Sequence, residues 1–364
     1  MPNSLRLSRH FAQGVLRFIA TKPTSVSGSR FMELYTRATD EFRMGNLANS
    51  IEINRMALNE ADTDSSVAWR DVAAVELNLS HVLKLVNQFE QARKLAESAL
   101  LKLDTHFSSS KHEVCHALDV LAELCCELQD METGLGYVNR SIELKSRIRG
   151  PSGVSLARSY NIRGALYLNR SMIADARSDY LRALGINVRH LGRERPLALP
   201  VGITLSNIGG VLRREEGRVN ECVELFREVV DCFEFNLTSE GTSWMLGSAL
   251  TDLAESLLEL RNRSSLDEAK SLLARSLHIF LSTRGTDHPS TARAAVLLRE
   301  CTKLESESNG NGVLMSSVSN QFVENLINEC EKIIPQKEGR ISGDIIFLDK
   351  RGHVGHGHPH TPLI

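Results

Sequence analysis

The chain has 364 residues, which suffices for two or three ordinary domains or for one elongated array. Its hydrophobic content of 42%, charged content of 24% and formal net charge of −2 are those of a folded chain with a buried core. No run of about 18 apolar residues occurs, so the sequence contains no candidate membrane-spanning helix. The seven cysteines form no C-x-x-C pair, which argues against a structural zinc site or a disulfide framework. An aromatic content of only 5% favours helices over a sheet.

Basic charge is concentrated at the amino terminus. Residues 1–32 contain five of the 43 basic side chains and no Asp or Glu, so the rest of the chain is weakly acidic. At helical spacing, Leu7, Phe11, Val15 and Phe18 share one face, and Arg6, Arg9, Gln13 and Arg17 lie largely opposite. Such a helix, followed by a stretch rich in Ser and Thr, is typical of a mitochondrial presequence. We therefore predict that residues 1–30 direct the chain to the mitochondrial matrix. The alternatives are a plastid address, or a basic helix without a targeting role in a cytoplasmic protein.

A repeat is visible in the small residues. One small residue recurs at spacings of 42, 42, 42, 46 and 47, at Ser50, Ala92, Gly134, Ala176, Cys222 and Ala269. A second small residue precedes the first four of these by twelve positions and the last two by slightly more, at Ala38, Ser80, Ala122, Gly164, Gly209 and Ala254. The apolar residues around the second set are spaced by three, four and seven, which indicates a helix face. Each unit is therefore predicted to be two antiparallel helices that approach closely at the small residues.

Chain breakers agree with this division. Four prolines fall between the second helix of one unit and the first helix of the next, and none falls inside a predicted helix, at Pro151, Pro196, Pro200 and Pro289. Four glycines fall at predicted turns, at Gly45, Gly150, Gly217 and Gly285. After the sixth unit, residues 290–305 are predicted to form one more helix that caps the array.

This spacing of small and apolar residues resembles the tetratricopeptide repeat. The 42-residue period and the run Gly285-Thr286-Asp287-His288-Pro289 resemble the longer repeats of kinesin light chains and nephrocystin-like proteins. The resemblance covers residues 31–305 and implies an all-α, right-handed superhelical solenoid of antiparallel helix pairs. Arg163 departs from the pattern, because an apolar residue is expected beside the tight Gly164.

The resemblance also implies a concave groove, lined by the first helices, that holds an extended peptide or a partner helix. Carried over position by position, the groove candidates are Asn78, His81 and Lys84, then Arg158, Asn161 and Asn169, then Asn207, Arg213 and Arg214. Asn amides can bond both groups of a bound backbone, and Arg can hold a carboxylate. Acidic residues occupy comparable places in the third and sixth units, at Asp119, Glu123, Asp252, Glu255 and Glu259. The groove is therefore expected to have mixed sign, although each residue could also be an ordinary solvated side chain.

Catalytic and metal-binding motifs are missing from the sequence. It contains no P-loop, nucleophile elbow or H-E-x-x-H motif, so we expect no enzyme, no cofactor and no metal site. Cys125, Cys126 and Cys222 are interpreted as buried structural thiols. His112, His116 and His190 are interpreted as surface residues near helix junctions.

The carboxy-terminal part has a different composition. Residues 306–320 are rich in Ser, Asn and Gly and are predicted to be a flexible linker. Residues 321–335 have the pattern of a short amphipathic helix. Residues 336–364 are predicted to be a disordered His-rich tail, in which the strand-like run 344–348 is too isolated to form a sheet.

The sequence thus predicts a protein-interaction scaffold that binds partner peptides or helices, as a mitochondrial assembly or regulatory factor. One alternative is a cytosolic cargo adaptor of the kinesin-light-chain kind, although no coiled coil precedes the repeats. Another is an organellar RNA-processing factor, although nucleic-acid binding calls for a basic surface and the repeat region is weakly acidic.

Overall fold

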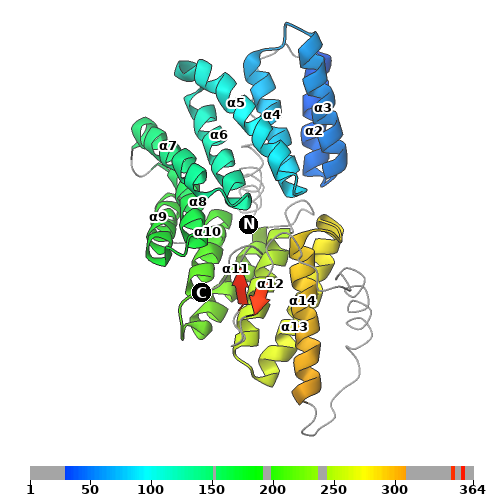
Figure 1. Cartoon of the computed structure of the whole chain (residues 1–364), viewed down its shortest axis with the longest axis vertical. Helices are drawn as coiled ribbons and strands as arrows, with labels where there is room; N and C mark the ends of the chain where they lie inside the picture. The colour runs from blue at the N-terminus through cyan, green and yellow to red at the C-terminus, as the bar shows by residue number, and fades with distance from the viewer. Residues whose placement is uncertain are drawn as a thin grey trace, which may run out of the picture. The chain divides into compact units, whose positions relative to one another are not determined.

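The computed structural model describes residues 29–150, 153–191, 198–236 and 244–308, together with two strands at 346–348 and 354–356. Among these residues are 13 helices, which follow one another as six pairs and a last single helix (Figure 1). The pairs are α2 (Arg30–Arg43) with α3 (Leu47–Thr63), α4 (Trp69–Leu85) with α5 (Phe89–Thr105), α6 (Phe107–Glu127) with α7 (Met131–Arg149), α8 (Leu156–Asn169) with α9 (Ile173–Leu191), α10 (Leu199–Leu212) with α11 (Val219–Asn236), and α12 (Trp244–Glu259) with α13 (Arg263–Thr283), before α14 (Pro289–Ser308). The expected all-α array of helix pairs is therefore confirmed.

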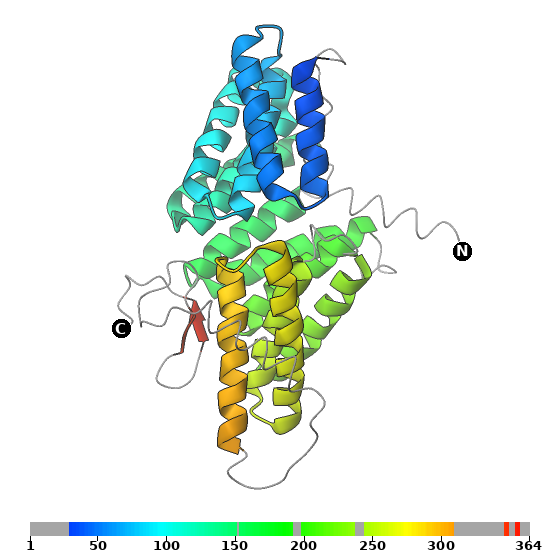
Figure 2. The ribbon, with the colours of Figure 1, turned by 90° about the vertical axis from the view of Figure 1, so that its right-hand side faces the viewer.

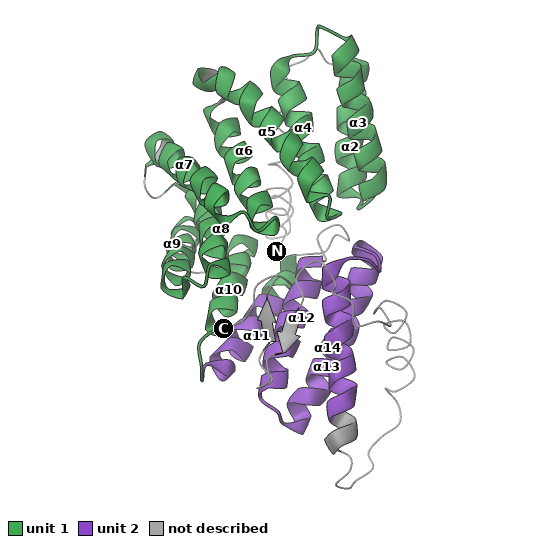
Figure 3. Ribbon diagram, viewed as in Figure 1, with its two compact units in different colours: residues 1–217, 231–241 green, residues 218–230, 242–364 purple. Residues whose placement is uncertain are grey.

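The chain divides into two compact units (Figure 3). Unit 1 comprises residues 1–217 and 231–241, and unit 2 comprises residues 218–230 and 242–364. Within each unit, the two helices of a pair lie side by side, as α2 with α3 in unit 1 and α12 with α13 in unit 2 (Figure 2). No helix among the described residues is long and apolar enough to cross a bilayer.

The small residues are buried where helices approach each other. Ser50, Ala92, Ala176, Cys222 and Ala269 are all fully buried. Gly134 and Gly164 occupy the same repeat positions, and both are buried. A Cβ atom at Gly164 would lie 2.5 Å from Cε1 of Tyr180 on α9, so only glycine fits beside that ring. This confirms the packing role predicted for the small residues.

The turn inside each pair also repeats. Its central residue has a positive φ at Gly45, Asn87, Gln129 and Ser171, which lie 42 residues apart, and again at Gly217. The sequence revealed only the glycines of this series, because Asn, Gln and Ser do not by themselves indicate a left-handed backbone. The turn is therefore imposed by the packing of the two helices even where no glycine relieves it.

Two of the four prolines lie inside the first turn of a helix and not in the connection before it. Pro200 and Pro289 fall inside the first turn of α10 and α14, and not before these helices. A proline is tolerated there because the first N–H groups of a helix have no intrahelical partner. Pro151 and Pro196 lie outside the described residues.

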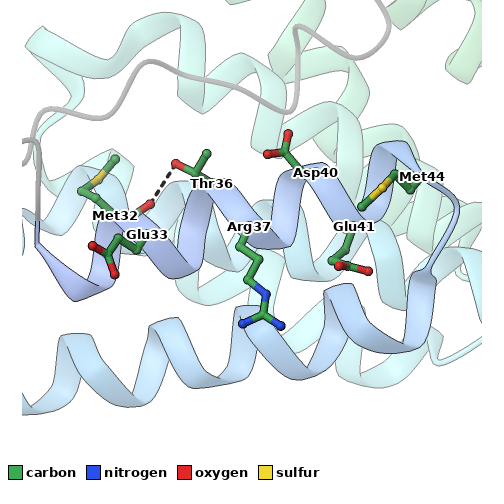
Figure 4. A pocket seen from close by; sticks show the side chains of 7 residues that line it. All are labelled: Met32, Glu33, Thr36, Arg37, Asp40, Glu41 and Met44. Atoms are coloured by element: carbon green, nitrogen blue, oxygen red, sulfur yellow. Dashed lines mark hydrogen bonds between the residues drawn. The ribbon is translucent and has the colours of Figure 1, made fainter.

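α2 is the first helix among the described residues of unit 1, and one of its faces is exposed. A depression of about 530 Å³ lies on this face and is lined by Met32, Glu33, Thr36, Arg37, Asp40, Glu41 and Met44 (Figure 4). One repeat later, α4 has buried Val75, Leu79, Val82 and Leu83 at the positions of Glu33, Arg37, Asp40 and Glu41. The face of α2 thus has charged residues at four positions where α4 has buried apolar ones, although Met32 and Met44 also line the depression.

The described parts of the termini are short. Ser29 caps α2 by accepting a hydrogen bond from the backbone N–H of Met32, at 3.3 Å. The rest of the predicted presequence lies outside the described residues, as do the predicted helix 321–335 and the predicted linker beyond Ser308.

In the tail, β1 (Ile346–Leu348) pairs antiparallel with β2 (Val354–His356). The prediction that the run 344–348 is too isolated to pair is therefore wrong, because the tail supplies its own second strand.

Candidate protein-interaction surface

The first helices of successive pairs form a row in unit 1. In this row α4 contacts α6, α6 contacts α8, and α8 contacts α10 (Figure 1). Among the described helices of this unit, no two second helices approach each other as closely. The row of first helices therefore lies on the inner side of the curve of unit 1. We call the exposed side of α4, α6, α8 and α10 the inner face.

A charged cluster closes the first part of the inner face. Glu123 on α6 accepts a hydrogen bond from Nζ of Lys84 on α4 at 2.5 Å and another from Nη2 of Arg158 on α8 at 2.8 Å. Burial alone would raise the pKa of Glu123, but Arg158 and Lys84 more than offset this and hold its pKa well below the usual range. Lys84 and Arg158, both predicted groove residues, therefore share one carboxylate of the protein itself.

Asp119 lies in a buried junction and not in the groove. It is 1% exposed, and its Oδ2 lies 2.5 Å from Nζ of Lys145 on α7, which is itself buried. Ser159 on α8 donates to Asp119 at 2.9 Å and accepts from Lys145 at 2.7 Å. The prediction that Asp119 lines the groove is wrong, because the side chain points between α6, α7 and α8.

Asn161 occupies the same kind of junction one repeat later. Its Nδ2 donates to Oγ1 of Thr204 on α10 at 2.9 Å, and Nδ2 of Asn187 on α9 donates to the same oxygen at 3.2 Å. Thr204 and Asn187 are buried. This predicted groove residue is half-buried and links α8 to α10, at a hydroxyl that Asn187 of α9 also reaches.

The remaining groove candidates differ in exposure. Asn78 is 8% exposed, which leaves no surface for a partner. His81 is half-buried and packs edge-on against the ring of Phe42 on α2, with the ring centroids 5.8 Å apart.

At the other end of the row, Asn169 and Arg214 are exposed, and Asn207 and Arg213 are half-buried. Nδ2 of Asn169 lies 3.0 Å from Sγ of Cys126, and Arg214 donates to the carbonyl of Leu168.

The first helix of the sixth pair carries an acidic counterpart. Asp252 and Glu255 on α12 both accept from Arg293 on α14, and the contact to Asp252 is 2.8 Å. Burial alone would lower the pKa of Arg293, but Glu255 and Asp252 raise it above the ordinary value. Glu255 is 1% exposed, whereas Glu259 is exposed.

The sequence did not single out Arg293. Its only sequence signal was its place near the start of the last helix.

The contacts of Arg163 explain why an arginine replaces the apolar residue that is expected beside Gly164. Its guanidinium makes two hydrogen bonds to Asp179 on α9, at 2.6 and 2.9 Å, and a third to Asn139 on α7 at 2.9 Å. Asp179 is 2% exposed, so the pair replaces an apolar contact with an ion pair at the same position. Sequence reasoning missed Asp179, because nothing in a sequence shows which partner a buried arginine has.

The thiols and imidazoles that the sequence singled out differ in burial. Cys125 and Cys222 are fully buried, and burial raises the pKa of Cys125 to about 11. Cys126 is only half-buried, so its interpretation as a buried thiol is wrong. His112 and His190 are exposed, as expected.

His116 does not match its interpretation as a surface residue near a helix junction. It lies in the middle of α6 and is half-buried. Within the described ranges, no group of three His, Cys, Asp or Glu residues could hold a metal ion.

Comparison with known proteins agrees with this architecture. A solved Rap protein, complexed with Competence and Sporulation Factor, superposes with a TM-score of 0.52 at 14% identity, over 78% of this chain and 77% of that one. The chain has a tetratricopeptide-repeat-like fold. A solved structure of BtubC from P. vanneervenii is also similar, with a TM-score of 0.49 at 14% identity over 71% of this chain and 96% of that one.

One curated relative is Protein NPGR2 from Arabidopsis thaliana, 25% identical over 256 residues. The match covers 64% of this chain but only 31% of the relative, so the chain spans about a third of that protein's length. No protein-family model matches the chain.

Proposed function

We propose that this chain is a non-catalytic scaffold that binds an extended peptide or a helix of a partner protein on the inner face of unit 1. One observation carries the proposal: α8, α10 and the two residues that follow α10 present amide and guanidinium groups at one end of the inner face. Asn169 and Arg214 are exposed there, next to the half-buried Asn207 and Arg213. The other end of the row is closed by Glu123, so the binding segment is assigned to α8 and α10.

The chemistry of these four side chains suits a specific peptide. An asparagine amide can donate to a backbone carbonyl and accept from a backbone N–H of one bound segment. The exposed guanidinium of Arg214, next to that of Arg213, can hold an arriving carboxylate. The Rap structure, which has the same fold, contains Competence and Sporulation Factor, so this architecture is able to hold a partner.

Proximity labelling with the full chain tests the proposal. The test variant is Asn169→Ala/Asn207→Ala/Arg213→Ala/Arg214→Ala, and the control is Asn59→Ala/Arg189→Ala at exposed positions on α3 and α9. We expect a defined partner protein that is lost from the test variant and kept by the control. Identical partners in both variants would contradict the assignment to the inner face. RNA binding that weakens steeply with salt would favour the RNA-processing alternative instead.

We also propose that the scaffold works inside mitochondria, as an assembly or regulatory factor. The acid-free, arginine-bearing segment 1–32 supports this location. Import of the full chain into isolated mitochondria provides the test, with Arg6→Gln/Arg9→Gln/Arg17→Gln as the variant. We expect uptake that needs the membrane potential and the three arginines. Uptake that needs neither, or no uptake at all, would contradict the proposed location.

A further inference from the structure

Residues 5–21, which we call the leading segment, continue the 42-residue period ahead of α2. They match α3 (Leu47–Thr63) position by position, one period earlier. Ser8 falls at the small position that the second helices share, and Leu16 falls at one of their apolar positions. In α3, α5, α7 and α9 these positions hold Ser50, Ala92, Gly134 and Ala176, and Leu58, Leu100, Ile142 and Leu184. The leading segment therefore has the sequence pattern of the second helix of a further pair, placed before α2.

The packing of α3 on α4 indicates where such a helix would lie. Ile51 and Leu58 of α3 pack against the core cluster that includes Leu83 of α4. One period before Leu83 stands Glu41 on α2, which lines the depression described above (Figure 4). The leading segment is therefore expected to lie along this depression.

The depression combines exposed apolar surface with acidic charge. Met44 is 58% exposed there, whereas Val86, one period later, packs against the core cluster of α4. Among the residues that line the depression are three acidic side chains and one arginine. Residues 1–28 contain four basic side chains and no acidic one. The leading segment and the depression are therefore of opposite charge.

One arginine position of the second helices makes contacts with the next pair. Arg93 on α5 and Arg177 on α9 stand at this position, 84 residues apart. Arg93 pairs with Asp130 at 3.2 Å, and Arg177 pairs with Glu215. Each acid stands three residues after the first helix of the next pair, α6 or α10. Arg9 of the leading segment stands at the same position, 84 residues before Arg93.

The matching acidic group at the end of α2 is Glu41. Three residues after α2 stands Asn46, an amide at the place where Asp130 and Glu215 follow α6 and α10. Nδ2 of Asn46 donates to Oε2 of Glu41 at 2.9 Å, and Nδ2 of Asn49 donates to the same oxygen at 3.2 Å. The two amides thus hold the carboxylate of Glu41 close to the place of those acids. A carboxylate has about four acceptor sites, so Glu41 can accept from a guanidinium as well.

We propose that the leading segment docks along the depression on α2 as the second helix of a further pair, with Arg9 paired to Glu41. Residues 22–29 connect the segment to α2, and this connection is longer than residues 64–68, which join α3 to α4. The inference does not rest on the proposed location. The same residues carry the proposed mitochondrial address, so a docked segment has to leave α2 before import.

Hydrogen exchange of the full chain tests the docking. In the native chain, we expect residues 5–21 to exchange at least about ten-fold more slowly than their intrinsic rates. Arg9→Glu and Glu41→Arg should each remove this protection, because each places like charges together. The charge swap Arg9→Glu/Glu41→Arg should restore most of it. If Glu41→Arg does not fold, Arg9→Glu still tests the docking, because it changes no residue of the helix pairs.

Two charge reversals serve as matched controls. Arg17→Glu should keep the protection, because Arg17 stands at the position of the exposed Asn59 on α3 and Leu101 on α5. Glu52→Arg, at an exposed position on α3, is the control for Glu41→Arg. Import should respond to Arg9→Glu and Arg17→Glu alike, so a loss of docking is distinguishable from a loss of targeting.

Three results would overturn the proposal. The first is exchange of residues 5–21 at the intrinsic rates in the native chain. The second is protection that Arg9→Glu and Arg17→Glu lower equally, or that the charge swap fails to restore. The third is protection that rises with protein concentration, because a second copy and not the same chain would then hold the segment.

Discussion

Two junctions of unit 1 stand at the same repeat position but use different chemistry. The first, between the third and fourth pairs, contains Asp119, Lys145 and Ser159, and the second, between the fourth and fifth pairs, contains Asn161, Asn187 and Thr204. The first is a buried ion pair completed by the hydroxyls of Ser141 and Ser159, whereas the second is two amides that share one hydroxyl. The comparison shows that one backbone arrangement accepts either an ion pair or two amides, although the buried Oδ1 of Asn161 has no hydrogen-bond partner among the described residues.

The largest effect is expected from removing one charge of the first junction. Lys145→Met leaves the buried carboxylate of Asp119 without its cation and should lower the free energy of unfolding by about 3–5 kcal/mol. Asn187→Leu removes an uncharged partner from the second junction and should cost about 1–3 kcal/mol. Urea unfolding of both variants measures this difference. Equal losses would contradict the distinction between the junctions.

Conversion of the first junction into the second should recover part of that loss. In Asp119→Asn/Lys145→Asn, both charges are replaced by the amides found one repeat later. A double-mutant cycle with the two single substitutions should give a coupling energy of about 2 kcal/mol. Additive single effects would mean that the two side chains do not act as a pair.

Acid should affect the charged part of the inner face more than the amide part. The pKa of Glu123 is depressed in the folded state, so its stabilising effect is fully present above its ordinary pKa of 4.5 and is lost as the pH falls through the folded-state value. At pH 7, Glu123→Gln should cost about 1.5 kcal/mol, and this difference from the native chain should shrink below pH 4.5. Urea unfolding between pH 7 and pH 3 measures it, and a difference that stays constant would contradict the lowered pKa.

The smallest effect is expected at the turn before α9. Ser171 has a φ of +59°, which glycine adopts without cost, so Ser171→Gly should raise the free energy of unfolding by about 0.5–1 kcal/mol. Gly45 stands at the same repeat position and has a φ of +84°. Gly45→Ala adds a Cβ atom to this left-handed residue and should lower the free energy of unfolding by a similar amount. Thermal unfolding compares the two. A loss of stability in Ser171→Gly would show that its side chain has a role that the backbone does not explain.

The sequence predicted the fold far better than the site, for a physical reason. Small residues such as Ala92 and Ala176 are required wherever two helices touch, so the period of the array appears directly in the sequence. A groove residue leaves no such trace, because its use depends on which side chain of another repeat it meets.

Particular residues show this limit. Lys84 and Arg158 looked available for a partner, but Glu123, 39 positions after Lys84 and 35 before Arg158, pairs with both. Asn161 looked like a peptide contact, but its partner Thr204 lies 43 positions away on another repeat.

The most direct test of the account is a thermal melt of Ala176→Phe. Ala176 is fully buried at the small position of the fourth pair, so a phenyl ring there must push α8 and α9 apart. We expect a loss of about 1–3 kcal/mol and a lower melting temperature, as overpacking of a core produces. Leu181→Phe, at an exposed position on the same helix, should leave the melt unchanged. A cooperative melt of Ala176→Phe at the native temperature would contradict the packing of helix pairs through regularly spaced small side chains.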